Sequence, residues 1–415
     1  MAKTPKELYE ERNGRITDAI QLRIPDRVPL NLSFGYFPAT YTGIPFRDAW
    51  YDYNTWLEAT KKTVLDFEPD GLFYIQSFTP GAALEHLDLN LVKWPGHGLP
   101  DDQRHRYVDG EWMKSDEYGA ALDNLSDYML RVLYPRISGA LEPLRMLPNI
   151  SSLGYSYNGL LTLAEVVARP EVAGALAKLQ KAGEEYAAVR IRVLTFNQDI
   201  EKLGFPITGP VGGGVPFDKI ARFLRGAEGA IEDITGQPDK LLELCEEQFV
   251  RTMKKIEVMT SGSVNRRVFV PLRYGADDSL TAPQFKKFYW PALKKVIMAF
   301  IEQGLTPCPF FEGKWDQRLE YLLELPRGGV LCHFAQTDMK RAKEVLGEHL
   351  CIMGGLPSPL LHSGTVEDVK DYCRKLIDDC AGDGGFILTN MPMDKAKPEN
   401  VRAMVDFTKE YGVYR

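Results

Sequence analysis

Short apolar runs alternate along the chain with amphipathic stretches, and this alternation constrains the fold more than any other feature. Eight runs have the length and residue content of strands: Val28–Phe34, Gly71–Ser77, Pro206–Gly212, Val268–Tyr274, Leu305–Glu312, Gly329–Phe334, Leu350–Gly355 and Gly385–Thr389. Helical patterns fall between them, at Ala49–Leu65, Asp218–Leu224, Pro238–Thr260, Ala282–Gln303, Asp316–Leu323, Asp338–Leu346, Thr365–Asp379 and Pro398–Tyr411. This order predicts an α/β fold. Eight strands with helical crossovers favour a (β/α)8 TIM barrel, with an open doubly wound sheet as the alternative.

One long segment, residues 87–205, breaks the alternation. Within it, a turn at Val108–Glu111 between short polar strands indicates a β-hairpin, and helical patterns follow near residues 126–133, 163–167 and 170–190. We interpret the segment as a helical and hairpin insertion in one β/α loop, placed over the barrel mouth. No repeat or linker interrupts the rest, so we predict a single domain over residues 1–415.

Charge and cysteine usage exclude several classes of function. The 415 residues carry 50 basic and 57 acidic side chains, a net charge of −7, with no basic block. This balance argues against binding to nucleic acid or to an anionic membrane. No apolar run approaches the ~20 residues of a membrane span. Six irregularly spaced cysteines and a polar, charged start predict a cytoplasmic protein with reduced thiols.

The most informative candidate residues end two consecutive predicted strands. Cys308, Phe310 and Glu312 share one face of the first strand, and His333 ends the next. Both strands end at the level where barrel enzymes carry their active sites, so Glu312 and His333 are expected side by side. They suit a hydrogen-bonded acid/base pair or two ligands of Zn²⁺, with Cys308 as a further candidate ligand. A buried histidine satisfied by an acidic partner is the structural alternative.

Other polar and aromatic residues follow the remaining strand ends. Arg273 ends the fourth predicted strand, where it either orients a substrate or forms an ion pair with a neighbouring acid. Aromatic residues crowd the ends of the first two strands, with Tyr36 after the first and Tyr74 around the second. A subset of these rings suits the wall of a flat apolar pocket, although most such residues pack in cores. We therefore predict Tyr36, Tyr74 and Arg273 as substrate-binding residues.

Several sequence motifs resemble the uroporphyrinogen decarboxylase superfamily over nearly the whole chain. They are Ile24-Pro-Asp-Arg-Val-Pro-Leu30, Phe285-Lys-Lys-Phe-Tyr-Trp-Pro291, Lys343-Glu-Val-Leu-Gly347, Cys351-Ile-Met-Gly-Gly355, Gly364-Thr-Val-Glu-Asp-Val369, Gly384-Gly-Phe-Ile-Leu388 and Lys397-Pro-Glu-Asn-Val-Arg-Ala-Met404. The resemblance implies the (β/α)8 barrel of that superfamily, in agreement with the strand pattern.

The superfamily contains decarboxylases and corrinoid-dependent methyltransferases, and the sequence departs from two of its patterns. An arginine-rich segment of the type Met-Arg-Gln-Ala-Gly-Arg, which holds substrate carboxylates in the decarboxylases, is missing after the first strand. The coenzyme M methyltransferases carry His-x-Cys-Gly where this chain has Phe310-Phe-Glu-Gly313, and a later cysteine is replaced in Leu388-Thr-Asn390. Neither porphyrinogen decarboxylation nor thiol methylation is therefore expected.

The closer resemblance is to the methyltransferases of anaerobic O-demethylase systems. Their zinc motif separates a glutamate from a histidine by twenty residues, the spacing of Glu312 and His333, whereas the other glutamate of the motif would fall on Ile297. The resemblance implies zinc, a methoxylated aromatic substrate and a separate corrinoid protein, because the chain lacks the Asp-x-His-x-x-Gly signature for cobalamin. Glu312, His333 and Arg273 are then the expected catalytic residues. The alternatives are a metal-free lyase that uses Arg273 and, more remotely, a binding module, and the sequence leaves a homodimer open.

Overall fold

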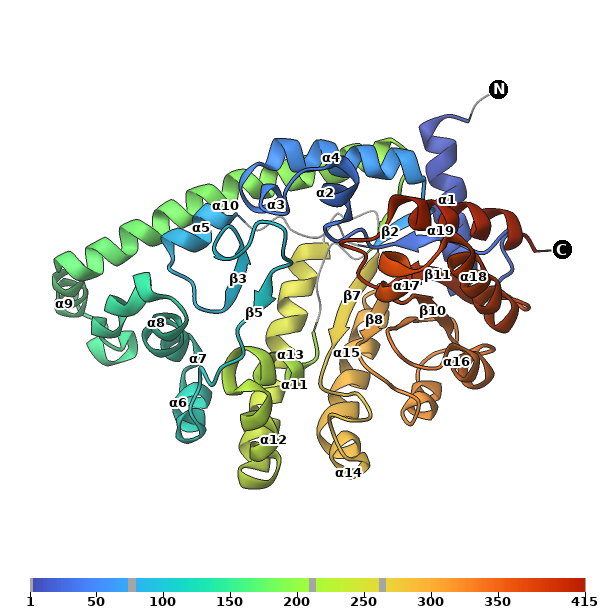
Figure 1. The fold of residues 1–415 in the computed structure, drawn as a ribbon. Coiled ribbons are helices and arrows are strands. Elements are labelled where there is room, and N and C mark those ends of the chain that lie inside the picture. The colour runs from blue at the N-terminus through green and yellow to red at the C-terminus, as the bar shows by residue number, and fades with distance from the viewer. Residues whose placement is uncertain (1–2, 74–79, 209–213, 261–265, 415) are drawn as a thin grey trace.

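The computed structural model describes residues 3–73, 80–208, 214–260 and 266–414 (Figure 1). Two parallel sheets organise this part of the chain. The first has the order β1-β2-β6, formed by β1 (Asn31–Leu32), β2 (Gly71–Phe73) and β6 (Ile207–Thr208). The second has the order β11-β10-β9-β8-β7, formed by β7 (Arg267–Leu272), β8 (Thr306–Phe311), β9 (Leu331–Phe334), β10 (Cys351–Leu356) and β11 (Phe386–Asn390).

Hydrogen bonds between β1 and β11 join the two sheets. The amide of Leu388 donates to the carbonyl of Pro29 at 2.9 Å, and Leu30 and Leu388 form a parallel bridge. The side chain of Asn390 accepts from the amide of Ser33 and donates to its carbonyl, at 3.1 and 2.8 Å. The strands therefore follow one parallel series, β6-β2-β1-β11-β10-β9-β8-β7. Within the described residues no ladder joins β6 to β7, so barrel closure is not observed there.

The predicted α/β pattern is confirmed. Each of the eight predicted runs overlaps one of these parallel strands, and the parts of the predictions at 74–77 and 209–212 lie outside the described residues. Helices of this part of the chain are α1 (Pro5–Ile20), α2 (Phe37–Thr42), α3 (Asp48–Tyr51), α4 (Tyr53–Phe67), α5 (Gly81–His86), α11 (Pro216–Ile220), η5 (Ala221–Arg225), α12 (Gly226–Gly236), α13 (Pro238–Thr260), α14 (Ala282–Gln284), η6 (Phe285–Tyr289), α15 (Trp290–Glu302), α16 (Met339–Leu346), α17 (Ser358–Ser363), α18 (Val366–Cys380) and α19 (Pro398–Tyr411). The helix predicted at 316–323 is instead a short 3₁₀ helix, η7 (Leu319–Glu324).

The segment predicted as an insertion lies between β2 and β6, after α5. It contains β3 (Val92–Pro95), β4 (Gly98–Leu99), β5 (Arg106–Tyr107), η1 (Ser115–Glu117), α6 (Tyr118–Asp123), α7 (Leu125–Tyr128), η2 (Met129–Leu133), α8 (Tyr134–Ile137), η3 (Gly139–Met146), η4 (Ile150–Leu153), α9 (Tyr157–Val167) and α10 (Pro170–Lys202). In Figure 1 the long helix α10 extends from α9, at the far left, towards the strands. Among the described helices, none is both long and apolar enough to cross a membrane.

The hairpin predicted around Val108–Glu111 is wrong. β5 pairs antiparallel with the earlier strand β3, and among the described residues no strand lies between β5 and β6. The residues after the turn bind a helical segment instead: the amide of Met113 donates to the carbonyl of Leu224 at 2.7 Å, and Glu111 pairs with Arg225. These contacts hold the chain beside η5 and leave no second strand for a hairpin.

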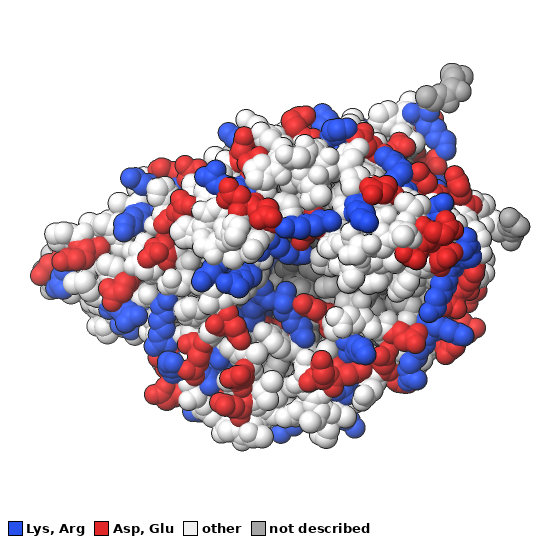
Figure 2. All heavy atoms as spheres, viewed as in Figure 1, with Lys and Arg blue, Asp and Glu red and all other residues white. Residues whose placement is uncertain are grey.

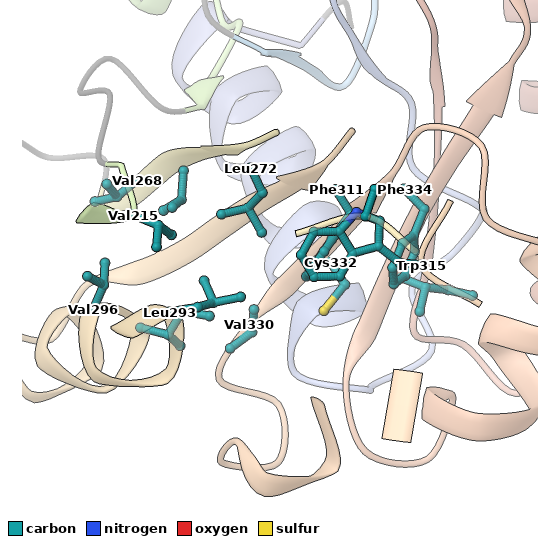
Figure 3. Packing of buried hydrophobic residues seen from close by; sticks show 14 of the residues in the cluster. Val215, Val268, Leu272, Leu293, Val296, Phe311, Trp315, Val330, Cys332 and Phe334 are labelled. Carbon is teal, nitrogen blue, oxygen red and sulfur yellow. The ribbon is translucent and has the colours of Figure 1, made fainter. Parts of the chain in front are cut away.

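The strands carry two different layers of buried side chains because successive residues face opposite sides. Outward residues pack on the surrounding helices, and Figure 3 shows Val268 and Leu272 of β7 facing Leu293 and Val296 of α15. Inward residues form a second apolar cluster, made of Phe73, Cys308, Leu331, Cys351, Met353 and Ile387 together with Ile16, Ala19 and Ile20 of α1. Helix α1 thus covers the amino-terminal ends of the strands, and the opposite, carboxyl ends are left for a site.

A buried ion network fastens α1 to the first two strands. Asp70, immediately before β2, accepts two hydrogen bonds from Arg27 at 2.7 Å, one from Arg15 of α1, and one from the amide of Leu30 at 2.9 Å. The side chain of Asp70 is only 1% exposed, and that of Arg15 only 4%. Arg15 also binds Asp26 through two bonds of 2.6 Å. Each buried charge therefore has an opposite charge and directed hydrogen bonds.

We predict that Asp70→Asn lowers the free energy of unfolding by about 3–5 kcal/mol, because it leaves the buried Arg15 and the partly buried Arg27 without the carboxylate that they share. Urea denaturation checks this. The control is Asp371→Asn, which breaks an exposed pair with Arg374 on α18 and should leave the unfolding curve within experimental error. Equal, small effects of the two substitutions would contradict the structural role of Asp70.

Candidate active site

A cavity of about 80 Å³ opens at the carboxyl ends of the strands. This volume is several times the ~10–15 Å³ that holds one water molecule. Residues from both sheets and from the loops beyond them line it: Ser33, Gly35, Phe73, Arg104, Phe269, Phe310, His333, Asn390, Met391 and Pro392. Parallel α/β folds place their ligand sites at this end of the strands. The cavity is therefore the candidate active site.

His333 is the polar side chain at the floor of the cavity. It lies on β9 directly opposite Phe310 of β8, its ring centroid 4.6 Å from that of Phe310 and 5.2 Å from that of Phe73. The residue is 4% exposed, and among the described residues neither ring nitrogen has a hydrogen-bond partner. Burial among these rings lowers the pKa of His333 to about 3. The imidazole is therefore neutral near pH 7, with one nitrogen able to donate and the other able to accept.

Glu312 and Arg273 lie at the rim, above the cavity wall. Glu312 follows β8, where its amide donates to the carbonyl of Leu272 at 3.1 Å. Its carboxylate accepts from Arg273 at 3.3 Å, and both side chains are about 40% exposed (42% for Glu312, 40% for Arg273). Neither residue lines the cavity. Of the two alternatives for Arg273, the structure therefore shows the ion pair with a neighbouring acid, Glu312. The side chain of Glu312 forms no hydrogen bond with His333.

A buried carboxylate positions this rim. Asp218, in the first turn of α11, accepts from the amides of Arg273 and Tyr274 at 3.2 and 2.9 Å and from the hydroxyl of Tyr289 at 2.7 Å. Burial raises the pKa of Asp218 to about 6, although these hydrogen bonds favour its charged form. Asp218 therefore fixes the backbone that follows β7, and this determines the position from which the Arg273 side chain extends.

The described residues do not fit a zinc ion. Cys308 points into the apolar cluster below the cavity, where burial raises the pKa of its thiol to about 12. Glu312 faces Arg273, so His333 is the one predicted ligand aimed into the cavity. In the described ranges no three His, Cys, Asp or Glu side chains form a metal-binding group, and residues 1–2, 74–79, 209–213, 261–265 and 415 contain none of these types.

The two predicted tyrosines do not form a described part of the cavity wall. Tyr36 is fully buried, stacks on Phe46 at 4.6 Å and hydrogen-bonds through its hydroxyl with Trp50 and His105. Tyr36 directly precedes α2, and its side chain lies in a buried apolar cluster with Phe46 and Trp50. Tyr74 lies outside the described residues. The rings on the described wall are Phe73, Phe269 and Phe310.

Three residues at the mouth were missed by the sequence reasoning. Arg104, in the insertion, lines the cavity and pairs with Asp394 at 3.3 Å. Burial, and after it the charges of Arg104 and Arg222, lowers the pKa of the neighbouring His105 to about 4. Arg222 reaches the same rim from η5 and stacks on the ring of Tyr107 at 3.8 Å. The sequence offered one indication of them, the prediction that the insertion covers the mouth. That prediction did not identify which residues of the chain lie there.

Parallel strands with crossover helices and a cavity at their carboxyl ends define an α/β protein of the kind that binds small ligands at that edge. The model of the uroporphyrinogen decarboxylase (URO-D) family matches residues 194–411, just over half of the chain. The chain therefore belongs to the URO-D family, as its motifs predicted.

A solved structure supports the fold over nearly the whole length. A methyltransferase from Methanosarcina mazei superposes with a TM-score of 0.63 at 14% sequence identity, covering 96% of this chain and 98% of that one. No curated protein matches the chain in sequence. At this level of identity the likeness shows a shared fold, and the cavity supplies the argument for function.

The buried imidazole predicts a specific dependence of stability on pH. Because the folded pKa of His333 is about 3 and its ordinary value is 6.5, the unfolded chain takes up a proton between these values that the folded chain does not. This contribution to stability is complete above pH 6.5 and declines by about 1.4 kcal/mol per pH unit as the pH falls towards 3. His333→Phe should therefore flatten the plot of unfolding free energy against pH by that slope, relative to the unmodified protein. Urea unfolding at a series of pH values from 4 to 7 measures this slope.

The control is His97→Gln, which removes an exposed histidine and should leave the slope unchanged. Parallel curves for His333→Phe and the unmodified protein would contradict the burial of a neutral imidazole.

Proposed function

We propose that this protein is a methyltransferase that transfers the methyl group of a methoxylated aromatic compound to the cobalt of a corrinoid carried by a separate protein. We further propose that its strands close into a (β/α)8 barrel. The observation that carries the proposal is the composition of the cavity: phenylalanine rings surround a neutral imidazole whose nitrogens have no partner among the described residues. Membership of the URO-D family and the shared fold with a methyltransferase support it.

The rings of the cavity wall favour an aromatic ligand. Phe73 and Phe269 meet edge to face, with centroids 5.0 Å apart and planes at 89°, and Phe310 lies 6.3 Å from Phe269. Such walls bind a flat ring through apolar burial and through edge and face contacts. Ser33, Asn390 and His333 add a few polar groups, as is typical of small-molecule sites. A tetrapyrrole with many carboxylates is a poor match for this floor.

The reaction requires stabilisation of a poor leaving group. Cobalt(I) of the corrinoid attacks the methyl carbon, the carbon–oxygen bond breaks, and the methyl group leaves with cobalt as methylcobalt(III) while a phenolate forms. Negative charge therefore develops on the ether oxygen, where a preorganised hydrogen-bond donor lowers the barrier. In this proposal, the N–H of neutral His333 donates to that oxygen, and a proton from solvent completes the phenol. Because the described residues do not fit a zinc ion, no step of this mechanism uses zinc. Whether the protein binds zinc is a separate prediction, which elemental analysis of the purified protein tests.

A lyase of the decarboxylase type is the second candidate, and one observation favours it. Arg104 lies on the cavity wall, and guanidinium groups bind the carboxylates that such enzymes remove. Its partner Asp394 already occupies part of that guanidinium, and the floor around His333 is uncharged. Incubation with uroporphyrinogen separates the two candidates, because the lyase releases coproporphyrinogen and the methyltransferase leaves the substrate intact.

We predict methyl transfer from 1,2-dimethoxybenzene, 2-methoxyphenol or 4-hydroxy-3-methoxybenzoate to cob(I)alamin, followed by the absorbance change to methylcobalamin. His333→Phe should lower kcat about 100- to 1,000-fold, the usual cost of removing one hydrogen-bond donor to developing charge. KM should change less, because the bond strengthens in the transition state.

His333→Gln retains an N–H donor and should recover part of the lost rate, whereas a merely structural histidine would show no such rescue. His97→Gln serves as the matched control and should retain full activity. If no donor methylates cob(I)alamin with a corrinoid protein also supplied, or if uroporphyrinogen is decarboxylated, the proposed function is wrong.

A further inference from the structure

Arg222 is a half-buried guanidinium at the mouth. It belongs to η5, and its charged group lies 3.8 Å above the ring of Tyr107 and 5.5 Å from the ring of Phe223. Among the described residues it forms no ion pair, and no side-chain hydrogen bond to an acceptor. A guanidinium has five N–H donors, and leaving them unpaired at a half-buried position is costly.

The other two mouth arginines already have acidic partners. Arg104 pairs with Asp394, and Arg273 pairs with Glu312, each at 3.3 Å. Residues outside the described ranges supply no carboxylate side chain for Arg222, because residues 1–2, 74–79, 209–213, 261–265 and 415 include no Asp or Glu. The rim therefore carries two arginines in ion pairs and a third, Arg222, that has no ion-pair partner among the described residues.

Several links place Arg222 beside the cavity. The ring of Tyr107, on which the Arg222 guanidinium lies, has its centroid 5.9 Å from that of His105. His105 directly follows Arg104, which lines the cavity. Figure 2 shows a hollow near the middle of this face with Lys and Arg side chains gathered along its edge.

We propose that Arg222 binds the carboxylate of the substrate, so that the methyl donor is a methoxylated aromatic monocarboxylate. This inference rests on the proposed function. The planar fork of a guanidinium matches a carboxylate through two parallel hydrogen bonds. A single uncompensated charge suits a monoanion better than a phosphate dianion. The ring of Tyr107 holds the guanidinium in place, which reduces the entropy lost on binding.

Binding is measured without any corrinoid, so that it does not depend on methyl transfer. Isothermal titration calorimetry compares 4-methoxybenzoate with the neutral 4-methoxybenzyl alcohol. Arg222→Met should weaken binding of 4-methoxybenzoate about 10- to 100-fold, the range for a lost charge-assisted hydrogen bond. Binding of the alcohol should change less than about twofold, because it makes no ionic contact. Arg222→Lys should recover part of the affinity for the carboxylate, since it keeps the charge but not the fork.

The control is Arg327→Met, which alters an exposed arginine before β9, at the opposite end of the strands, and should change neither affinity. Equal binding of 4-methoxybenzoate by Arg222→Met and the unmodified protein would overturn the inference, as would equal losses for the acid and the alcohol. The two proposals fail separately. Tight, Arg222-dependent binding of the acid without methyl transfer contradicts the function alone, whereas methyl transfer with no preference for carboxylated donors contradicts the inference alone.

Discussion

Parallel hydrogen bonding between neighbouring strands is the constraint on which the site depends. Register pairs Phe310 with His333 and Met353 with His333 on either side, so that β8, β9 and β10 reach the same level. Because all these strands run in one direction, their carboxyl ends meet at one edge, and the loops beyond them face a common space. The amino-terminal ends are covered by α1, whose position the Asp70 network fixes. Among the described residues, the carboxyl ends of the strands are therefore left uncovered by α1, and the cavity lies there.

The site separates a dry floor from a charged rim. At the floor, phenylalanine rings remove water from His333 and keep its imidazole neutral. At the rim, Asp218 binds the amides of Arg273 and Tyr274, which holds the charged residues after β7 in place. An aromatic ether with a carboxylate fits this division, because its ring and ether oxygen meet the floor while its anionic group meets the rim. The same division makes the floor sensitive to acid, since protonation places an uncompensated charge among apolar side chains.

Local patterns in the sequence predicted the strands and the position of His333. Most of the site features that the sequence did not predict depend on contacts between residues far apart in the chain. Alternation of side chains places His333 inward at the end of β9, and a single strand carries enough information for that. Arg222 and Arg104 both lie at the mouth although they are far apart in the chain, so no spacing reveals them. Glu312 was expected beside His333, but its side chain pairs with Arg273 across the rim. Tyr36 could not be assigned from its pattern, because buried clusters and pocket walls use the same aromatic residues.

The most direct test of this account is a crystal structure of the protein with 4-methoxybenzoate bound. The account predicts the aromatic ring among Phe73, Phe269 and Phe310, the ether oxygen within hydrogen-bond distance of an imidazole nitrogen of His333, and the carboxylate on Arg222. A ligand bound elsewhere, or a His333 whose nitrogens are held by protein groups or a metal ion with the ether oxygen remote from them, would contradict it.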